Sequence, residues 1–301
     1  MVKLVAAIHN RSYSPWTIKD MKIAIRKFYR WLRGMERGTD PPETKWIIRK
    51  IPKNALRTPS PSQLLSKDDI AKILDVVNHP RNRALIAVLF ESGFRISELA
   101  NMSIGDIQFD KYGAMLKVHG KTGSRPVQLI ISTRYLMTWL ESHPNRHDEQ
   151  APLWINIGNT HRFQQMQYAS IKKLIQVTFE AAGVNKRCNP HFFRHSIASY
   201  LANRLTEAQM CQYFGWVQSS RMPSYYIYLS GQELVSPILK LQGLANDHVK
   251  ESDALKPQVC SRCDTLNQHD FRYCCKCAAL LDQRYVLEQQ ELERRDAQDP
   301  L

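Results

Sequence analysis

The sequence predicts a mainly helical fold with a small β-sheet, divided into two larger domains and a short cysteine-rich module. Three observations support this prediction. Apolar residues recur at helical spacing behind capping residues over most of the chain. Two strand-like runs, residues 114–118 and 126–130, flank a glycine-containing turn at 120–124. Near the C-terminal end, four cysteines occur as two closely spaced pairs.

The bulk composition indicates a globular protein that acts on a polyanion. The chain has 301 residues, of which 43% are hydrophobic, enough for two domains with separate cores. Its longest purely apolar stretch, residues 84–90, is too short to cross a bilayer, and its start lacks the long apolar run of a secretory signal. We therefore expect a cytoplasmic protein without a membrane partner. The net charge of +14 favours nucleic acid as the partner.

Much of this charge lies in residues 1–60, which hold fourteen Lys or Arg against four Asp or Glu. A helix is expected over 17–33, with Thr17 as its N-cap. Its apolar face repeats at helical spacing: Met21, Ile25, Phe28 and Leu32. A second stripe is basic: Lys19, Lys22, Arg26, Arg30 and Arg33. This stripe is interpreted as a contact surface for the DNA backbone, with a solvated helix face as the alternative.

The Pro- and Ser-rich segment 58–62 predicts a domain boundary, and a new helix begins at Ser66. The strand region is expected over 106–131. Helices are expected on both sides of it, at 66–77, 81–92, 96–102, 132–142, 167–182, 190–203, 206–214 and 231–243.

The helix expected from residue 190 carries a candidate phosphate site. Asn189 suits its N-cap and Pro190 its first position. His191, Arg194 and His195 then share one face, at a helix N-terminus whose free N–H groups add to the positive field.

Three other segments have a structural and a functional interpretation. Arg95 lies in a tight turn after Gly93, where it either pairs with Glu98 or serves a site. Lys121 is either an ordinary turn residue or a proton donor that reaches into a cleft. The tyrosine cluster 225–228 is either packing or the source of a nucleophile beside the phosphate site.

Taken in order, these segments resemble the catalytic domain of the tyrosine recombinase (phage integrase) family over residues 65–245. The specific parts are FRISEL at 94–99 and HFFRH at 191–195, followed by FGW at 214–216 and the tyrosines. Residues 1–60 resemble the family's helical core-binding domain, trimmed at its start. The C-terminal part looks closest to archaeal integrases that carry a zinc ribbon.

The resemblance implies a catalytic residue set: Arg95, Lys121, His191, Arg194, Trp216 and Tyr226. It implies that the two arginines clamp the scissile phosphate and that Lys121 protonates the departing 5′ hydroxyl. His191 would assist the tyrosine as acid or base, while Trp216 packs or donates one hydrogen bond. Tyr226 would attack phosphorus, so that neither ATP nor a catalytic metal is needed.

The choice of tyrosine is open at this point. Counted from Trp216, the spacing common in bacterial relatives selects Tyr225. The sequence from Tyr226 onward matches the family's Tyr-x-His-Leu ending better, so Tyr226 is preferred. Tyr228 is the third candidate.

Cys260, Cys263, Cys274 and Cys277 have the spacing of a structural zinc site, with ten residues between the two pairs. Cys275 could replace Cys274. A zinc ribbon is therefore predicted over 256–282, and no function is assigned to the charged tail, 283–301.

The sequence thus predicts a site-specific DNA recombinase that integrates or excises a mobile element. The resemblance also implies a tetramer on double-stranded DNA, in which the segment 232–242 packs on a neighbouring protomer or, equally, within its own chain. The rival hypotheses are strand relaxation in the manner of a type IB topoisomerase and a DNA-binding regulator without catalysis.

Overall fold

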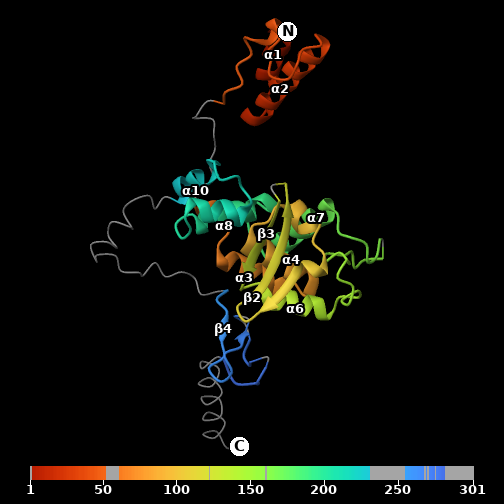
Figure 1. Ribbon diagram of the computed structural model, residues 1–301, viewed down its shortest axis with the longest axis vertical. Helices are drawn as coiled ribbons and strands as arrows, with labels where there is room; N and C mark the ends of the chain where they lie inside the picture. The colour runs from red at the N-terminus through yellow and green to blue at the C-terminus, as the bar shows by residue number, and fades with distance from the viewer. Residues whose placement is uncertain are drawn as a thin grey trace, which may run out of the picture. The chain divides into compact units, whose positions relative to one another are not determined.

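The computed structural model describes residues 2–51, 61–121, 123–159, 161–230, 255–267, 269, 271–274 and 276–281. The chain divides into two compact units, Met1–Pro59 and Ser60–Leu301 (Figure 1). No helix of the described residues is long and apolar enough to cross a membrane. Most of the predicted boundary at 58–62, the helix at 231–243, Cys275 and the tail at 283–301 lie outside the described residues.

The N-terminal unit contains two helices, α1 (Val2–His9) and α2 (Pro15–Leu32), followed by the short 3-10 turn η1 (Pro42–Thr44). The prediction that Thr17 caps α2 is wrong. Ser14 is the N-cap, because the Thr17 backbone N–H donates to its Oγ at 3.1 Å and the following proline occupies the first turn. The sequence did not predict α1.

The basic stripe of α2 faces the segment that follows the helix. Arg26 is 4% exposed and pairs with Asp40, which Arg30 also approaches, at 3.6 Å. Arg33 pairs with Glu43, and the Lys22 ammonium donates to the Ile48 carbonyl at 3.1 Å. Acidic groups outside the helix therefore compensate part of the stripe, and the buried Arg26 is not the surface cation that the sequence predicted.

The predicted apolar face of α2, by contrast, is more exposed than the sequence led us to expect. Phe28 and Leu32 are 53% and 57% exposed, and Trp31 beside them is 74% exposed. The helix is amphipathic as predicted, but two of the four predicted apolar positions remain largely exposed in this unit, whereas Met21 and Ile25 are half-buried.

The second unit holds the remaining described elements. Before the sheet come η3 (Pro61–Gln63), α3 (Lys67–Val76), α4 (Pro80–Ser92), α5 (Ile96–Ala100) and η4 (Ile104–Asp106). The sheet comprises β1 (Ile107–Asp110), β2 (Gly113–Gly120) and β3 (Gly123–Leu129). Five helices follow: α6 (Thr133–Glu141), α7 (Tyr168–Ala181), α8 (Pro190–Leu201), α9 (Glu207–Phe214) and α10 (Met222–Ser230). The mainly helical fold class is confirmed.

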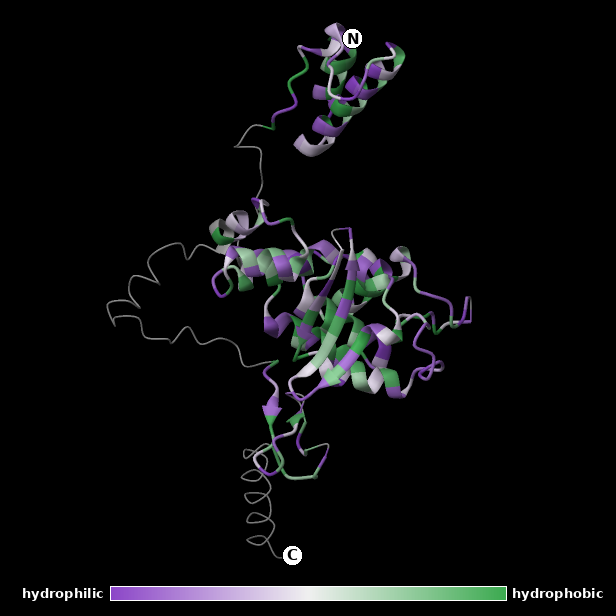
Figure 2. Ribbon diagram, viewed as in Figure 1, coloured by the Kyte–Doolittle hydropathy of each residue, from purple (hydrophilic) through white to green (hydrophobic). Residues whose placement is uncertain are grey.

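Helix α4 forms the centre of this unit. Residues 84–90 are buried all round, and the hydrophobic positions of α4 and the strands lie together in the middle of the unit (Figure 2). Gly93 ends α4 with φ +58°, and a Cβ there would lie 2.4 Å from Ile197 Cγ2. Only glycine fits, so the end of α4 can approach α8 closely.

The three strands form an antiparallel sheet in the order β1-β2-β3 (Figure 1). In β3, Arg125, Val127 and Leu129 are buried while the residues between them are more exposed, as alternation in a strand requires. At the end of the hairpin, Gly120 pairs with Gly123, which places Lys121 in the turn.

Helices α8, α9 and α10 share a second, smaller apolar cluster. Its buried members are Ile197, Ala198, Ala202, Met210, Phe214 and Tyr226. The sequence did not predict α10. Pro223 falls in its first turn, where a missing N–H is tolerated, and the tyrosine-rich composition gave no helical periodicity.

Candidate active site

Two arginines meet at the C-terminal end of α9. Arg194, on α8, is 5% exposed and donates from Nη2 to the Phe214 carbonyl at 2.6 Å. Arg95, at the start of α5, donates from Nη2 to the next carbonyl, that of Gly215, at 3.3 Å. Because the two acceptors are consecutive carbonyls, the guanidinium groups lie close together.

Arg194 is fixed on several sides. Its Nη1 donates to the Gly93 carbonyl at 2.9 Å, and its guanidinium lies over the Phe214 and Trp216 rings, at 5.0 and 5.3 Å from their centroids. Burial, with the charge of Arg95, lowers its pKa to about 10, so the side chain stays charged at neutral pH. Each guanidinium has five N–H donors. Donors therefore remain for an anion.

A buried carboxylate holds Arg95 in place. Glu98 accepts from Arg95 Nη1 at 2.8 Å and from the Arg95 backbone N–H at 3.0 Å. It also pairs with Arg125 of β3, at 2.9 and 3.2 Å. Burial alone would raise the pKa of Glu98, but the hydrogen bonds and charges of the two arginines outweigh it and the pKa is lowered. The Arg95–Glu98 pair expected from the structural interpretation is thus present, next to the second arginine.

Tyr226 lies beside this cluster. Its ring stacks on that of Trp216, with centroids 5.6 Å apart and an interplanar angle of 6°. Trp216 stacks in turn on Phe214, at 4.9 Å. The Tyr226 side chain is 2% exposed, and its hydroxyl lies 2.8 Å from His195 Nδ1. Burial raises the pKa of Tyr226 to about 12, although the charge of Arg194 acts in the opposite direction.

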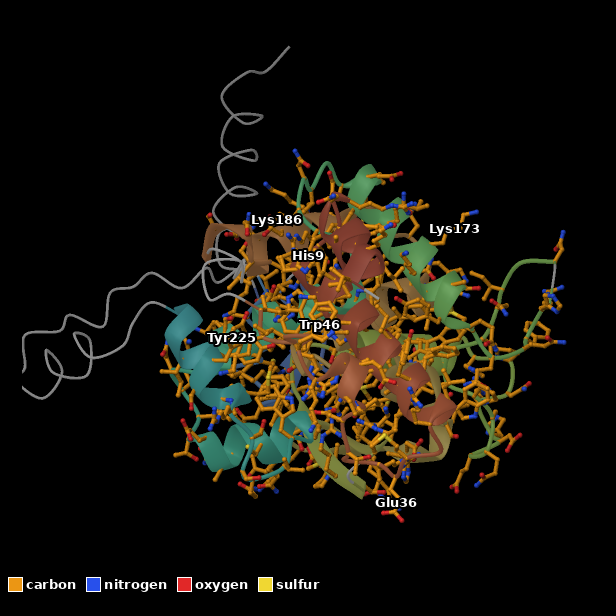
Figure 3. All side chains as sticks on the ribbon, turned by 90° about the horizontal axis from the view of Figure 1, so that it is seen from above. His9, Glu36, Trp46, Lys173, Lys186 and Tyr225 are labelled. Carbon is orange, nitrogen blue, oxygen red and sulfur yellow. The ribbon has the colours of Figure 1, made fainter. Side chains whose placement is uncertain are left out.

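The alternative tyrosines differ in their surroundings. Tyr225 is half-buried on α10 (Figure 3), and its ring meets Tyr226 edge-on at 5.3 Å. Burial raises the pKa of Tyr225 as well. The side chain of Tyr228 lies outside the described residues. Of the two described tyrosines, Tyr226 is the one stacked on Trp216 and bonded to His195.

The two remaining candidates are exposed. His191 is in the first turn of α8, where Asn189 Oδ1 accepts from the Phe192 backbone N–H at 2.9 Å. It borders a hollow that Phe94 and Lys172 also line. Lys121 is exposed in the turn between β2 and β3.

Residues 63–233 match the phage integrase family, which is more than half of the chain. The chain belongs to the phage integrase family.

Curated relatives agree with this family assignment, and solved structures share the fold. The tyrosine recombinase XerA of Pyrococcus horikoshii is 24% identical over 211 residues, covering 70% of this chain and 68% of the relative. The tyrosine recombinase XerD of Lacticaseibacillus casei is 26% identical over 239 residues, covering 75% and 77%. The structure of XerH bound to difH DNA after cleavage has a TM-score of 0.61 at 19% identity, over 80% of this chain and 72% of that one. The Tn1549 transposon integrase with circular intermediate DNA has a TM-score of 0.58 at 13% identity, over 81% and 84%.

Two contacts of the site were not predicted, because Arg125 was not a candidate and His195 was expected only as part of the phosphate site. Arg125 and His195 contact Glu98 and Tyr226, respectively. The signal for Arg125 was in the sequence, because it alternates with Val127 and Leu129 and so occupies an inward position of a strand. A charge at such a position indicates a buried partner. His195 was placed on the same helix face as Arg194, but no sequence signal linked it to a tyrosine 31 residues away.

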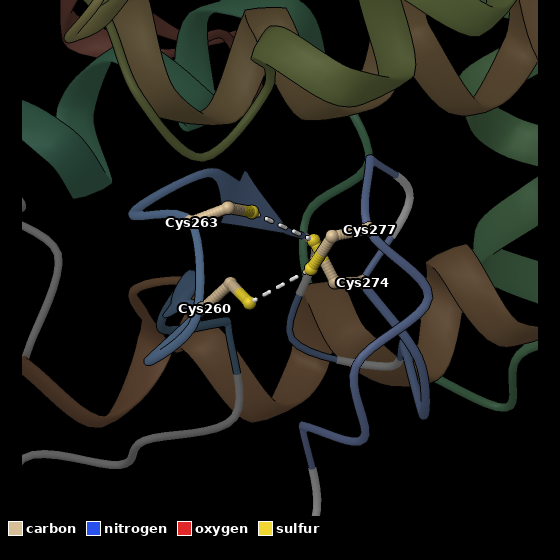
Figure 4. A group of neighbouring side chains, drawn as sticks. All are labelled: Cys260, Cys263, Cys274 and Cys277. Carbon is tan, nitrogen blue, oxygen red and sulfur yellow. Dashed lines mark hydrogen bonds between the residues drawn. The ribbon is translucent and has the colours of Figure 1, made fainter.

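The cysteine module lies beyond the residues matched by the family. It contains two short antiparallel strands, β4 (Gln258–Val259) and β5 (Leu266–Asn267). The Sγ atoms of four cysteines point toward one another and all lie within 4.8 Å: Cys260, Cys263, Cys274 and Cys277 (Figure 4). Among the described residues this is the one cluster suited to a metal.

The two cysteine pairs lie on two separate backbone turns of the same kind. In the first, Cys260 N–H donates to Thr265 O at 3.0 Å and Asp264 has φ +53°. In the second, Cys274 N–H donates to Ala279 O at 2.7 Å and Ala278 has φ +56°.

Backbone N–H groups inside each turn also point at sulfur. Arg262 N–H lies 3.4 Å from Cys260 Sγ, and Lys276 N–H lies 3.4 Å from Cys274 Sγ. Donors aimed at sulfur favour thiolates, so the donor set fits a tetrahedral thiolate-bound ion.

Proposed function

We propose that the chain is a site-specific DNA recombinase that breaks and rejoins strands through a 3′-phosphotyrosyl bond at Tyr226. Integration or excision of a mobile element is the reaction that we assign to it. The observation that carries the proposal is the stack in which Trp216 contacts both the Arg194 guanidinium and the Tyr226 ring. The indole ring thus holds together an arginine that can bind a phosphate and a tyrosine that can attack it, which is an arrangement suited to phosphoryl transfer.

The proposed reaction begins with a DNA phosphate between Arg95 and Arg194, whose free N–H donors match phosphate oxygens. The Tyr226 oxygen bonds to phosphorus, and the bond from phosphorus to the 5′ oxygen breaks. Lys121, which is exposed in the hairpin turn, protonates the departing oxygen, and His191 is the exposed acid or base beside the phosphate. Rejoining reverses these steps, so the phosphodiester energy is conserved without ATP or a catalytic metal.

Partners and cofactor belong to the same proposal. Double-stranded DNA is the substrate, and a homo-tetramer assembles on two sites. The DNA backbone is contacted by the less buried members of the basic stripe of α2: Lys19, Lys22, Arg30 and Arg33. A zinc ion bound by Cys260, Cys263, Cys274 and Cys277 would supply folding energy to the C-terminal module and no chemistry, because four thiolates leave no open position.

The test is a trapped covalent complex. Duplexes from the sequences flanking the gene, nicked so that cleavage releases a short fragment, are incubated with wild type, Tyr226→Phe and Tyr225→Phe. We expect an adduct that resists denaturation and is lost only in Tyr226→Phe. Loss only in Tyr225→Phe would move the nucleophile by one residue. Tight binding of a site-containing duplex without any adduct would favour the regulator, and strand relaxation without a second site would favour the topoisomerase.

A further inference from the structure

His195 makes the direct contact with the proposed nucleophile. Its Nδ1 lies 2.8 Å from the Tyr226 hydroxyl. Because the pKa of Tyr226 is about 12, the phenol is protonated at neutral pH and donates this hydrogen bond. Nδ1 is then the acceptor, and the imidazole carries its proton on Nε2. His195 therefore presents the unprotonated nitrogen Nδ1, with its lone pair, to the proton that Tyr226 must lose.

We propose that His195 is a catalytic residue that holds the Tyr226 hydroxyl and accepts its proton as the oxygen attacks phosphorus. This inference rests on the proposed function and adds the proton acceptor to it. As the bond from oxygen to phosphorus forms, the phenolic proton moves to Nδ1, and neutral His195 becomes an imidazolium. The bond to the 5′ oxygen breaks, and that oxygen takes its proton from Lys121. In the rejoining step the imidazolium returns its proton to the tyrosine oxygen.

The position of His195 in the chain brings the acceptor to the phosphate. It follows Arg194 directly on α8, so the residue that binds the phosphate and the residue that takes the proton are fixed by one turn of helix. His191, one turn earlier, is exposed, whereas the Tyr226 hydroxyl is bonded to His195. The stack on Trp216 holds the phenol ring in the plane that makes this bond.

The surroundings of His195 keep it in the accepting form. Burial, followed by the charges of His191, Arg194 and Arg187, lowers its pKa below the ordinary value of 6.5. On the neighbouring helix α10, the group that faces His195 is the Tyr226 hydroxyl, and the ring of Tyr225 lies next to that of Tyr226. A neutral imidazole at pH 7 is a competent acceptor, and its protonated form, which dominates only at lower pH, is not.

The experiment compares wild type, His195→Asn and His191→Asn in single-turnover cleavage of the nicked duplex that gives the wild-type adduct. Asparagine keeps an acceptor near the Nδ1 position but does not take up a proton at these pH values. We expect His195→Asn to cleave about 100-fold or more slowly, as the loss of a general base does. Wild type and His191→Asn should both lose rate as the pH falls through the pKa of His195, below 6.5. His195→Asn should lack this inflection.

A substrate with sulfur in place of the 5′ bridging oxygen separates the two protons of the reaction. A thiolate leaves without protonation because its pKa is about 8.5, so this substrate should restore cleavage to Lys121→Ala. It should leave His195→Asn slow, since the nucleophile still has to lose its proton. Unchanged binding of the same duplex by His195→Asn shows that the variant is folded.

Three outcomes would overturn the inference. One is cleavage by His195→Asn at the wild-type rate. Another is a wild-type pH profile without an inflection below 6.5, which needs no substitution. The third is rescue of His195→Asn by the sulfur substrate, which would assign the residue to the leaving group. If wild type itself forms no adduct with a duplex shown to contain its site, the proposed function fails first and the inference fails with it.

Discussion

Arg125 and Glu98 form a buried ion pair through two hydrogen bonds, with Nη2 to Oε2 at 2.9 Å and Nη1 to Oε1 at 3.2 Å. The same carboxylate orients Arg95. Since Arg125 Nε also donates to the Tyr213 carbonyl at 2.9 Å, one side chain joins the strand β3 to helix α9 and to the start of α5. The pair therefore connects the hairpin that carries Lys121 to the site of the two arginines.

Removing Arg125 should weaken both the fold and the site. In Arg125→Met the Glu98 carboxylate loses its main partner inside the protein. Breaking a buried pair in this way destabilises by about 3–5 kcal/mol. We expect a loss of this size in urea unfolding, together with slower adduct formation under conditions where the variant is folded. Lys173→Met, at an exposed position of α7 (Figure 3), should change the unfolding free energy by less than about 0.5 kcal/mol. Equal effects in both variants would contradict the role of the pair.

Gly93 allows a prediction with a matched control. Gly93 and Gly183 have φ of +58° and +64°, but only Gly93 has Ile197 Cγ2 at 2.4 Å from an added Cβ, whereas Gly183 has nothing within 4 Å. Alanine at Gly183 should destabilise by about 1 kcal/mol for its left-handed backbone alone. Gly93→Ala should lose about 1–3 kcal/mol more, because it forces α8 away from α4. Thermal or urea unfolding measures both, and similar losses would refute the close approach.

The Lys186–Asp69 pair predicts a pH dependence of stability. The two side chains meet at 2.6 Å (Lys186 is labelled in Figure 3). Burial would raise the pKa of Asp69, but hydrogen bonds from Lys186 and Ser66 outweigh it and the pKa is lowered. A depressed carboxyl pKa stabilises the fold above the unfolded value of about 3.9, and this contribution is lost as the pH falls through the folded value. Asp69→Asn should therefore be less stable than wild type at pH 7, and the difference should shrink below about pH 4. A constant difference over this range would exclude the linkage.

The cysteine module should contain one zinc ion per chain. Metal analysis after dialysis should find it in wild type and lose it in Cys260→Ser. Cys188→Ser, a half-buried cysteine outside the cluster, should keep it. Cobalt in place of zinc should give the thiolate absorption of a tetrahedral site. Strong chelators should remove the ion without abolishing adduct formation, and loss of both together would show that cleavage depends on the metal-bound module.

The basic stripe of α2 makes a prediction about salt. Arg33 has a side chain that is 60% exposed, whereas Arg26 is buried against Asp40. Arg33→Glu should reduce the slope of log binding constant against log salt by about 0.9 for each phosphate contact that is lost. Arg26→Gln should instead destabilise the N-terminal unit and leave the slope of the folded protein unchanged. An unchanged slope in Arg33→Glu would remove this residue from the DNA contact.

Local chemistry made much of the fold predictable. Ser66 caps α3 with Asp69, and Asn189 caps α8, because both sequences carry their own hydrogen-bond partners within three residues. The cysteine pairs were also predictable from local sequence, because only two residues separate the cysteines of each pair. In α2, by contrast, two residues with suitable side chains compete for the cap, and the proline after Ser14 decides between them.

Contacts between distant segments could not be predicted. Asp40 and Glu43 neutralise part of the α2 stripe from beyond the helix, so the charge pattern along the helix alone gave the wrong burial for Arg26. His195 meets Tyr226 because α8 and α10 pack together, a fact that no spacing encodes. The family resemblance supplied the arginines and the tyrosine as expectations, and it did not supply Arg125 or His195.

The membership of Tyr226 in the small apolar cluster of α8, α9 and α10 has a genetic consequence. Phenylalanine retains the ring that fills this cluster and removes only the hydroxyl, so Tyr226→Phe should fold and occupy DNA normally. In a cell that makes both proteins, the inert copies would enter the proposed tetramer together with active ones. We expect the substitution to be dominant, with recombination between two target sites falling as the share of inert protein rises, and more steeply than by simple dilution.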